Sequence, residues 1–141
     1  MNLDVLRRYR AQLEEVVRMD LFLLRQDLQD AEARSRLLEE HMRLTTDAYL
    51  AKAAGVVALD EFLVWQSRFQ AETSMLAQAR QEEVRISEAW SHKQDELRET
   101  MQDRRKLDRL ADRMRQQRQL VQHRVDQIEM DEAARRTSVM R

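Results

Sequence analysis

The sequence predicts an all-α fold in which two long helices form an antiparallel coiled-coil hairpin. Two observations predict it: the 141 residues include one glycine and no proline, and apolar residues recur every three or four positions. A globular chain carries roughly 7% Gly and 5% Pro, so sandwiches, barrels and doubly wound sheets, which need many tight turns, are excluded. The length suits a single domain over residues 1–141, because domains usually have about 100 to 200 residues.

The first helix is expected over about residues 3–51. One seam of mostly apolar residues runs along it at spacings of three and four, and such a seam faces a partner helix along its whole length. Its positions are Leu3, Leu6, Arg10, Leu13, Val17, Leu21, Leu24, Leu28, Ala31, Ser35, Leu38, Met42, Thr45 and Tyr49.

A turn is expected at about residues 53–58. Gly55 follows the last periodic residue, and glycine there usually takes the left-handed backbone conformation that ends a helix. Asp60 then stands where a carboxylate complements the positive end of a helix dipole. Two helices joined by a short turn run antiparallel, so we expect Tyr49 beside Phe62 and Leu6 beside Arg104.

The second helix is expected over about residues 59–136. Its two seam positions recur every seven residues, from Phe62 to Val125 and from Trp65 to Ile128, which is the strongest signal in the sequence. The first helix is shorter, so the second is expected to project without an internal partner from Leu107 onward. The projecting part carries an apolar stripe of Leu107, Leu110, Ala111, Met114, Val121, Val125 and Ile128.

Charge is distributed unevenly along the chain. Residues 1–103 have a net charge of −6 and residues 104–141 a net charge of +5, although the whole chain carries only −1. A basic end on an acidic body suggests a binding element for an acidic partner. A basic stretch before heptads is also a DNA-binding layout, but Asp108 and Asp112 interrupt it here. A protein partner is therefore favoured over a solvated face, and both are favoured over nucleic acid.

The sequence argues against an enzyme and against any cofactor. His41, His92 and His123 lie far apart and form no metal-ligand spacing. Acidic pairs such as Glu14-Glu15, Glu39-Glu40 and Glu82-Glu83 are expected on solvated helix faces, because a two-helix rod offers no pocket that would perturb their pKa values.

The sequence also predicts a cytoplasmic protein without direct membrane insertion. The longest apolar run, Ala53–Leu59, is far shorter than the roughly 20 residues that cross a bilayer. The N-terminal residues lack the apolar stretch of a secretory signal, and the absence of cysteine agrees with a reducing compartment.

An aromatic cluster follows the turn, at Phe62, Trp65 and Phe69. Packing in the seam explains most of these side chains. Leu63 and Val64 point away from that seam, however, and aromatic residues on the flank of a rod often anchor protein–protein interfaces. Both readings of the cluster remain open.

The whole arrangement resembles the FliJ family of the bacterial flagellar protein export machinery. The matching features are the opening Leu-x2-Leu-Arg-Arg-Tyr-Arg, the Gly turn, the three aromatics and the basic second helix. The most specific feature is the ending Arg124-Val125-Asp126-Gln127-x2-Met130-Asp131-Glu132. Stalk proteins of injectisomes, the related type III secretion systems, are similar too.

The resemblance implies a non-catalytic stalk or chaperone-type protein that couples ATP hydrolysis to protein export, needed for flagellum biogenesis and thus for chemotaxis. Implied partners are the hexameric export ATPase FliI, the export gate protein FlhA and subunit chaperones, at the cytoplasmic face of the inner cell membrane as a peripheral protein. A purely structural, self-associating coiled coil is the alternative from another class.

The resemblance also implies two sets of contact residues. The set for the ATPase is Arg104, Arg105, Arg109, Arg113, Arg118, Arg124, Asp126, Met130, Asp131 and Glu132. The set for the gate is Leu38, Met42, Tyr49, Phe62, Trp65 and Phe69.

Overall fold

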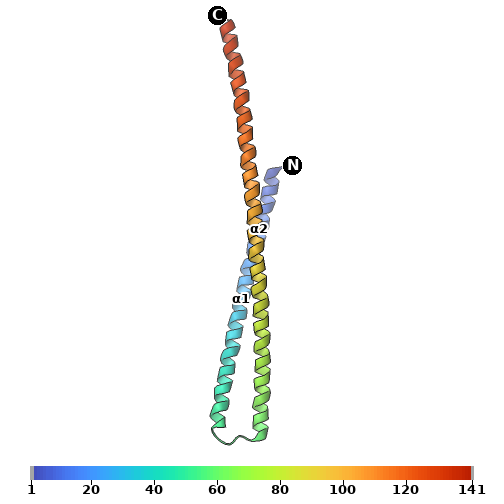
Figure 1. Ribbon diagram of the computed structural model, residues 1–141, viewed down its shortest axis with the longest axis vertical. Helices are drawn as coiled ribbons and strands as arrows, with labels where there is room; N and C mark the ends of the chain where they lie inside the picture. Colours follow the sequence, from blue (N-terminus) through green and yellow to red (C-terminus); the bar gives the residue numbers. More distant parts are fainter. Residues whose placement is uncertain (1, 141) are drawn as a thin grey trace. The chain divides into compact units, whose positions relative to one another are not determined.

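The computed structural model describes residues 2–140 and consists of two α-helices (Figure 1). Helix α1 spans Leu3–Ala53 and helix α2 spans Leu59–Val139, with residues 54–58 between them. The helices pack against each other as a hairpin in which α2, with 81 residues, is longer than α1, with 51. The predicted all-α hairpin is confirmed. Met1 and Arg141, which the expected single domain includes, lie outside the described residues.

The described residues form two compact units. The hairpin unit is Val16–Leu97 and includes the connection between the helices. The terminal unit combines residues 2–15, at the start of α1, with residues 98–140, which include the rest of α2. Each unit is described by itself below.

The predicted seam forms the core of the hairpin unit. Every seam position of α1 from Val17 to Tyr49, and of α2 from Trp65 to Leu97, is buried or half-buried. Only Val17 and Ala79 are buried apolar residues, with 2% and 5% of their surface exposed. A two-helix layer has no thick core, so the interdigitated seam and the ion pairs along its edges hold the helices together.

Lys93 occupies a seam position of the hairpin unit with its ammonium group at the edge. Its Nζ lies 3.0 Å from Glu96 Oε2 and 3.4 Å from Asp20 Oδ2 of α1. The hydrogen bond to Glu96 raises the pKa of Lys93 above its ordinary value, against the opposing effect of burial, and Asp20 raises it further. Lys93 therefore stays charged and ties α2 to α1.

The terminal unit is held by ion pairs between the start of α1 and α2. Arg7 Nη2 lies 3.1 Å from Asp108 Oδ1, and Arg10 Nη1 lies 3.4 Å from Asp103 Oδ2. Leu107 and Ala111 are half-buried, and every residue from Asp112 to Met140 is exposed. The unpartnered part of α2 was expected to begin at Leu107. That expectation was one turn too early, because the first turn of α1, which begins at Leu3, still covers α2 beyond Leu107.

The register of the helices also differs from the expected one. Tyr49 does not pair with Phe62: its ring lies 5.7 Å, between centroids, from both Trp65 and Phe69. Arg104 pairs with Glu14 rather than lying at Leu6. The connection spans residues 54–58 and α2 starts at Leu59, so the difference lies in how the two helices align rather than in the position of the turn, and spacing along one helix does not determine that alignment.

The ends of the helices are capped by short-range hydrogen bonds. Asn2 caps α1, since its Oδ1 accepts a hydrogen bond from the Asp4 backbone NH at 3.1 Å. Gly55 does not have the left-handed conformation predicted for it. Its NH instead donates to the Lys52 carbonyl at 3.2 Å, a tightened last turn that any residue can adopt. Asp60 and Glu61 lie in the first turn of α2, as the dipole argument expected for Asp60.

Over the described residues, neither helix contains a stretch both long and apolar enough to cross a membrane.

Candidate partner-binding surfaces

A groove of about 610 Å³ opens on α2 near the connection, in the hairpin unit. We call it the aromatic groove. No charged side chain lines it, and its lining residues are Tyr49, Phe62, Trp65, Gln66, Phe69, Gln70, Thr73, Ser74 and Ala77. An uncharged concave surface of this size suits apolar side chains of a partner protein.

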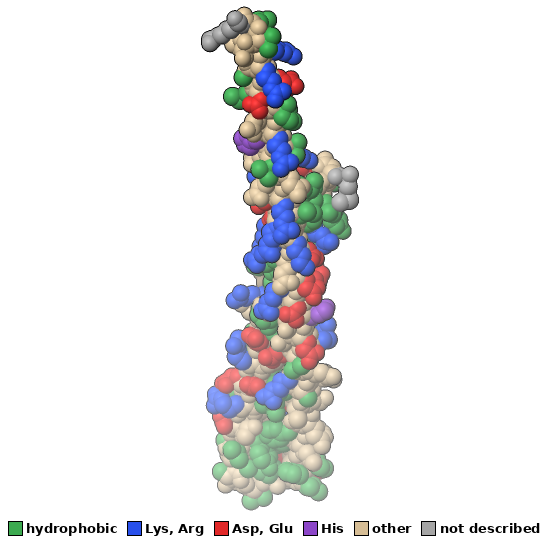
Figure 2. Space-filling model, turned by 45° about the horizontal axis from the view of Figure 1, so that its top comes forward, with side chains coloured by type: hydrophobic (Ala, Val, Ile, Leu, Met, Phe, Trp, Pro, Cys, Tyr) green, Lys and Arg blue, Asp and Glu red, His purple; other side chains and the backbone are tan. Residues whose placement is uncertain are grey.

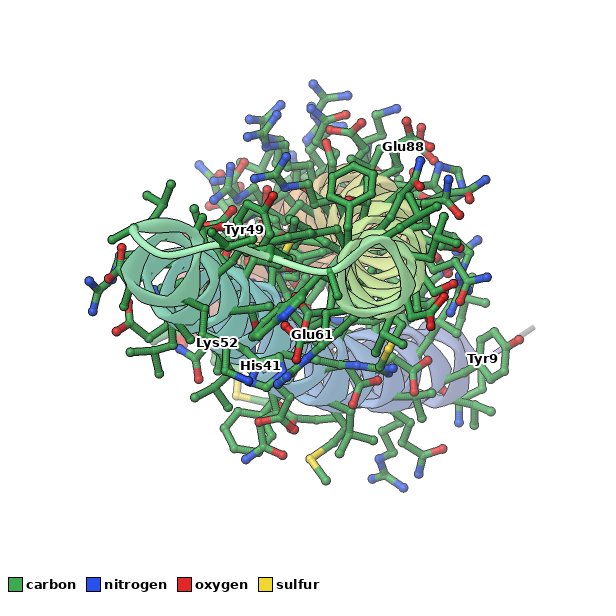
Figure 3. The ribbon with its side chains drawn as sticks, turned by 90° about the horizontal axis from the view of Figure 1, so that it is seen from below. Tyr9, His41, Tyr49, Lys52, Glu61 and Glu88 are labelled. Atoms are coloured by element: carbon green, nitrogen blue, oxygen red, sulfur yellow. The ribbon has the colours of Figure 1, made fainter. Side chains whose placement is uncertain are left out.

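Helical spacing explains why these residues share one surface. Phe62, Trp65 and Phe69 follow one another at three and four residues on α2, so their side chains lie on the same face. Tyr49 reaches this face from α1 (Figure 3), and its ring meets Phe69 edge to face at 88°. Edge-to-face packing of aromatic rings is favourable. Phe62, on the same face of α2, keeps 43% of its surface exposed.

Two cations border the aromatic groove at Trp65. Arg68 Cζ lies 5.4 Å and Lys52 Nζ lies 5.9 Å from the centre of the Trp65 ring. Both distances fall within the range of cation–π attraction. The cations hold the indole ring in place and mark the edge where the groove gives way to charged surface.

A buried polar cluster lies beside the groove and fixes the two helices against each other. Thr45 Oγ1 lies 2.9 Å from Glu72 Oε1, and both residues are buried, with 3% and 7% of their surface exposed. His41 Nε2 and Arg68 Nε approach the same carboxylate oxygen at 3.1 and 3.4 Å. Sequence reasoning placed Thr45 and Glu72 in the seam but missed their contact, which depends on the register.

The aromatic groove gathers four of the six residues predicted to contact the gate. Tyr49, Phe62, Trp65 and Phe69 line it, whereas Leu38 and Met42 are half-buried in the seam of α1 and lie outside the lining. Hydrophobic side chains gather at the lower end of the molecule in Figure 2, where the connection lies. The assignment of these residues to a partner remains a prediction.

The second candidate surface is the part of α2 from Asp112 to Val139, which we call the C-terminal segment. It remains helical, and all its side chains are exposed. Met114, Val121, Val125 and Ile128 continue the seam phase of α2, with exposed fractions between 38% and 60%. A stripe of this kind on an unpaired helix is typical of a binding surface.

Most residues predicted to contact the ATPase lie exposed in the terminal unit. Arg105 and Arg109 are exposed on α2 just before the C-terminal segment. Within the segment itself, the exposed members of the predicted set are Arg113, Arg118, Arg124, Asp126, Met130, Asp131 and Glu132. The visible face of this end shows basic, acidic and hydrophobic side chains side by side (Figure 2).

Arg104 differs from the other members of this set because it faces α1. Its Nε lies 2.6 Å from Oε2 of Glu14, and Nη1 lies 3.9 Å from Asp108 Oδ2. Glu14 is only 3% exposed. The expectation that the Glu14-Glu15 pair lies on a solvated face was wrong for Glu14, since α2 covers that carboxylate.

The ion pairs leave a cationic face on the terminal unit. Asp103, Asp108 and Asp112, the acidic residues among the arginines, pair with Arg10, Arg7 and Arg115. Within the part of the chain that the structure describes, Arg105, Arg109 and Arg113 have no such ion pair. Asp103 and Asp108 pair with α1 and so do not neutralise Arg105, Arg109 and Arg113, which no count of charges could reveal.

We find no candidate metal-ion site in residues 2–140. No group of three or more His, Asp or Glu side chains is placed to hold a metal ion there, and His41 contacts Glu72 in the polar cluster.

Comparison with known protein families gives a match over nearly the whole chain. The model of the family FliJ, described as flagellar FliJ protein, matches residues 1–140. No curated protein and no solved structure matches the chain significantly.

Proposed function

The chain belongs to the FliJ family of flagellar export proteins, and we propose that it is a stalk that joins the export ATPase FliI to the export gate protein FlhA. The stalk performs no chemistry of its own. It binds inside the ATPase hexamer through the terminal unit and binds the gate through the hairpin unit, so that ATP hydrolysis by the ring is coupled to protein export.

One observation carries the proposal: α2 continues as an unpaired helix from Asp112 to Val139 with an apolar stripe and cationic neighbours. An apolar stripe stabilises a helix only when a partner buries it. The central opening of a ring offers surfaces on several sides, which suits a helix exposed all round. The terminal unit also includes both ends of the described chain, so both helices would enter the ring.

The stalk acts on the ring by differential binding. One helix side is cationic and another is apolar, so ring subunits around it meet different surfaces. A ligand shifts a conformational equilibrium only when it binds one state better than another. An asymmetric stalk therefore favours different nucleotide states in different subunits and promotes assembly of the hexamer.

The aromatic groove is the proposed contact for FlhA. Its uncharged lining and its rigid Tyr49–Trp65–Phe69 ring cluster provide the aromatic anchors that dominate many interfaces. Subunit chaperones are further proposed partners. The protein would act at the cytoplasmic face of the inner membrane, bound there through the gate.

Two alternatives predict different partners. An injectisome stalk would bind the ATPase of that secretion system rather than FliI. A purely structural coiled coil would self-associate through the C-terminal segment and would bind neither the ATPase nor the gate.

A truncation tests the proposal directly. A chain that ends at Ala111 keeps every buried or half-buried residue of α2 and loses the C-terminal segment. We expect it to keep binding FlhA in a pull-down and to lose stimulation of FliI ATPase activity. Full stimulation by the truncated chain would refute the stalk role of the segment.

A further inference from the structure

Two rows of side chains line the aromatic groove along α2. At 3.6 residues per turn, Phe62, Trp65 and Phe69 lie within about 60° of one another around the helix, and Tyr49 of α1 packs against this aromatic row. The second row, which we call the polar row, lies beside the first on the side away from α1. It consists of four exposed, uncharged residues, Gln66, Gln70, Thr73 and Ser74. Among the described residues, none of these four side chains has a hydrogen-bond partner, so the polar row can bond a partner protein.

The absence of charge restricts what the groove can bind. A charged side chain of a partner would lose its water there and would gain no counter-charge. The bordering cations, Lys52 and Arg68, lie over the Trp65 ring and do not belong to the lining. The groove is therefore complementary to an uncharged, mainly apolar segment.

The polar row favours an extended segment over a helix. A helix bonds its own N–H and C=O groups internally, so it offers a partner only side chains. The apolar face of such a helix would bury the carboxamides of Gln66 and Gln70 without partners, at a cost to binding. An extended chain leaves the N–H and the C=O of each residue free. A carboxamide can accept a hydrogen bond from the first and donate one to the second.

The spacing of the polar row also matches an extended chain. Gln66 and Gln70 are one turn apart, about 6 Å along α2. In a β-strand, alternate residues direct their N–H and C=O groups to the same edge, at steps of about 6.6 Å. Each turn of α2 therefore meets two residues of an extended chain, and the same step leads from Gln70 to Ser74. From Phe62 to Ala77 the groove is about 22 Å long, which accommodates about seven extended residues.

We propose that the FlhA segment in the aromatic groove is extended and uncharged, a proposal that rests on the proposed contact between this groove and FlhA. Every second side chain of the segment is apolar and packs against the aromatic row. Its backbone N–H and C=O groups bond the polar row. Backbone hydrogen bonds then provide affinity and the alternate side chains provide specificity, as when a peptide adds to the edge of a sheet.

Two glutamine changes test the extended conformation. Gln66→Leu combined with Gln70→Leu removes both carboxamides and keeps helix propensity, which is similar for Gln and Leu. We expect FlhA binding to weaken at least tenfold in calorimetric titration, because backbone groups of the bound segment lose their partners. The matched control, Gln78→Leu with Gln81→Leu, changes two exposed residues of the hairpin unit outside the groove lining and should leave the affinity unchanged. Equal or tighter binding by the first variant, as an apolar helix would give, would overturn the proposal.

Phe62→Ala separates failure of this proposal from failure of the FlhA contact. If Phe62→Ala weakens FlhA binding and the Gln66/Gln70 variant does not, the groove is the contact but the bound segment is not extended. If neither variant changes the affinity, the contact itself is rejected, and the extended segment with it.

Hydrogen exchange of FlhA identifies the bound segment. A stretch of about seven uncharged residues that exchanges freely in FlhA alone should become protected when the unaltered chain is added. Phe62→Ala and the Gln66/Gln70 variant should both reduce that protection. New protection confined to helices of FlhA, or to a stretch that carries charged side chains, would overturn the proposal.

Discussion

Glu14 and Arg104 form an ion pair in the terminal unit, with Oε2 and Nε 2.6 Å apart. The carboxylate is almost wholly enclosed, since the Glu14 side chain is 5% exposed, whereas the Arg104 side chain is 36% exposed. Loss of Arg104 therefore affects a charge that is buried, whereas loss of Glu14 affects a charge that water can reach.

Removing the cation should cost more than removing the carboxylate. Arg104→Leu removes a cation that contacts a buried carboxylate, and we expect it to lower the free energy of unfolding by about 2–3 kcal/mol. Glu14→Leu puts an apolar side chain at a buried position and leaves Arg104 near Asp108 and water, so about 1 kcal/mol or less should be lost. Urea unfolding of both variants checks the order, and equal losses would contradict it.

The Thr45–Glu72 contact leads to a prediction of the same kind. A buried charge that is replaced by an apolar residue of similar volume often leaves stability unchanged or higher. Glu72→Leu should therefore keep the free energy of unfolding within about 1 kcal/mol or raise it. Thr45→Val, which removes the hydroxyl and leaves the carboxylate buried, should cost about 1–2 kcal/mol. A loss above 2 kcal/mol for Glu72→Leu would show that the carboxylate stabilises the seam.

The seam positions could be predicted from sequence because they depend only on helix geometry. Spacings of three and four on a 3.6-residue helix keep side chains on one face, and each predicted position from Leu3 to Tyr49 is buried or half-buried. The register could not be predicted, because spacing along one helix does not determine which residues of the other helix lie opposite. Contacts between the helices, such as Tyr49 with Trp65 and Glu14 with Arg104, were missed for that reason.

The candidate surfaces were predictable in part. The aromatic cluster and the basic end stand out as residue types close together in sequence. The cationic face required knowledge of which arginines Asp103 and Asp108 neutralise, and that follows from contacts with α1. Apolar residues are dense over residues 16–24 of the sequence, but only the structure shows that Val16, Met19 and Leu23 among them are left exposed.

Gly55 offers a test of the turn, because the observed and the left-handed backbone conformations predict opposite changes in stability when the glycine is replaced by alanine. Its backbone is not left-handed, and an added Cβ would meet only the Lys52 carbonyl oxygen, at 3.8 Å. Gly55→Ala should therefore raise the free energy of unfolding by about 0.4–1 kcal/mol, because the unfolded chain loses freedom. Ala54→Gly, the matched control, should lower it by a similar amount. Destabilisation by Gly55→Ala would restore the left-handed cap.

Phe62 allows the proposed FlhA contact to be separated from the stability of the hairpin unit. Phe62 lines the aromatic groove but is 43% exposed, whereas Phe69 packs against Tyr49. Both Phe62→Ala and Phe69→Ala should weaken FlhA binding about tenfold or more. Phe69→Ala should also cost about 2 kcal/mol of stability, and Phe62→Ala less than 1 kcal/mol.

The control for this comparison is the neighbouring residue. Leu63 is 49% exposed and lies outside the groove lining, so Leu63→Ala should leave FlhA affinity unchanged. Calorimetric titration of FlhA with the three variants measures the affinities. If Leu63→Ala weakens binding as much as Phe62→Ala, the gate contact extends beyond the groove.

The cationic face of the terminal unit gives the most direct test of the ATPase contact. Arg109 and Arg113 are exposed and carry charge that no described ion pair neutralises. Changing both to Glu should reduce stimulation of FliI ATPase activity at least tenfold while circular dichroism stays unchanged, because exposed helix positions tolerate Glu as well as Arg. Arg25→Glu with Arg36→Glu makes the same change of charge in the hairpin unit and should leave stimulation intact.

Because exposed charges are screened by salt, stimulation by the unaltered chain should also fall as ionic strength rises. Equal effects of the two double variants would mean that net charge, rather than this face, attracts the ATPase.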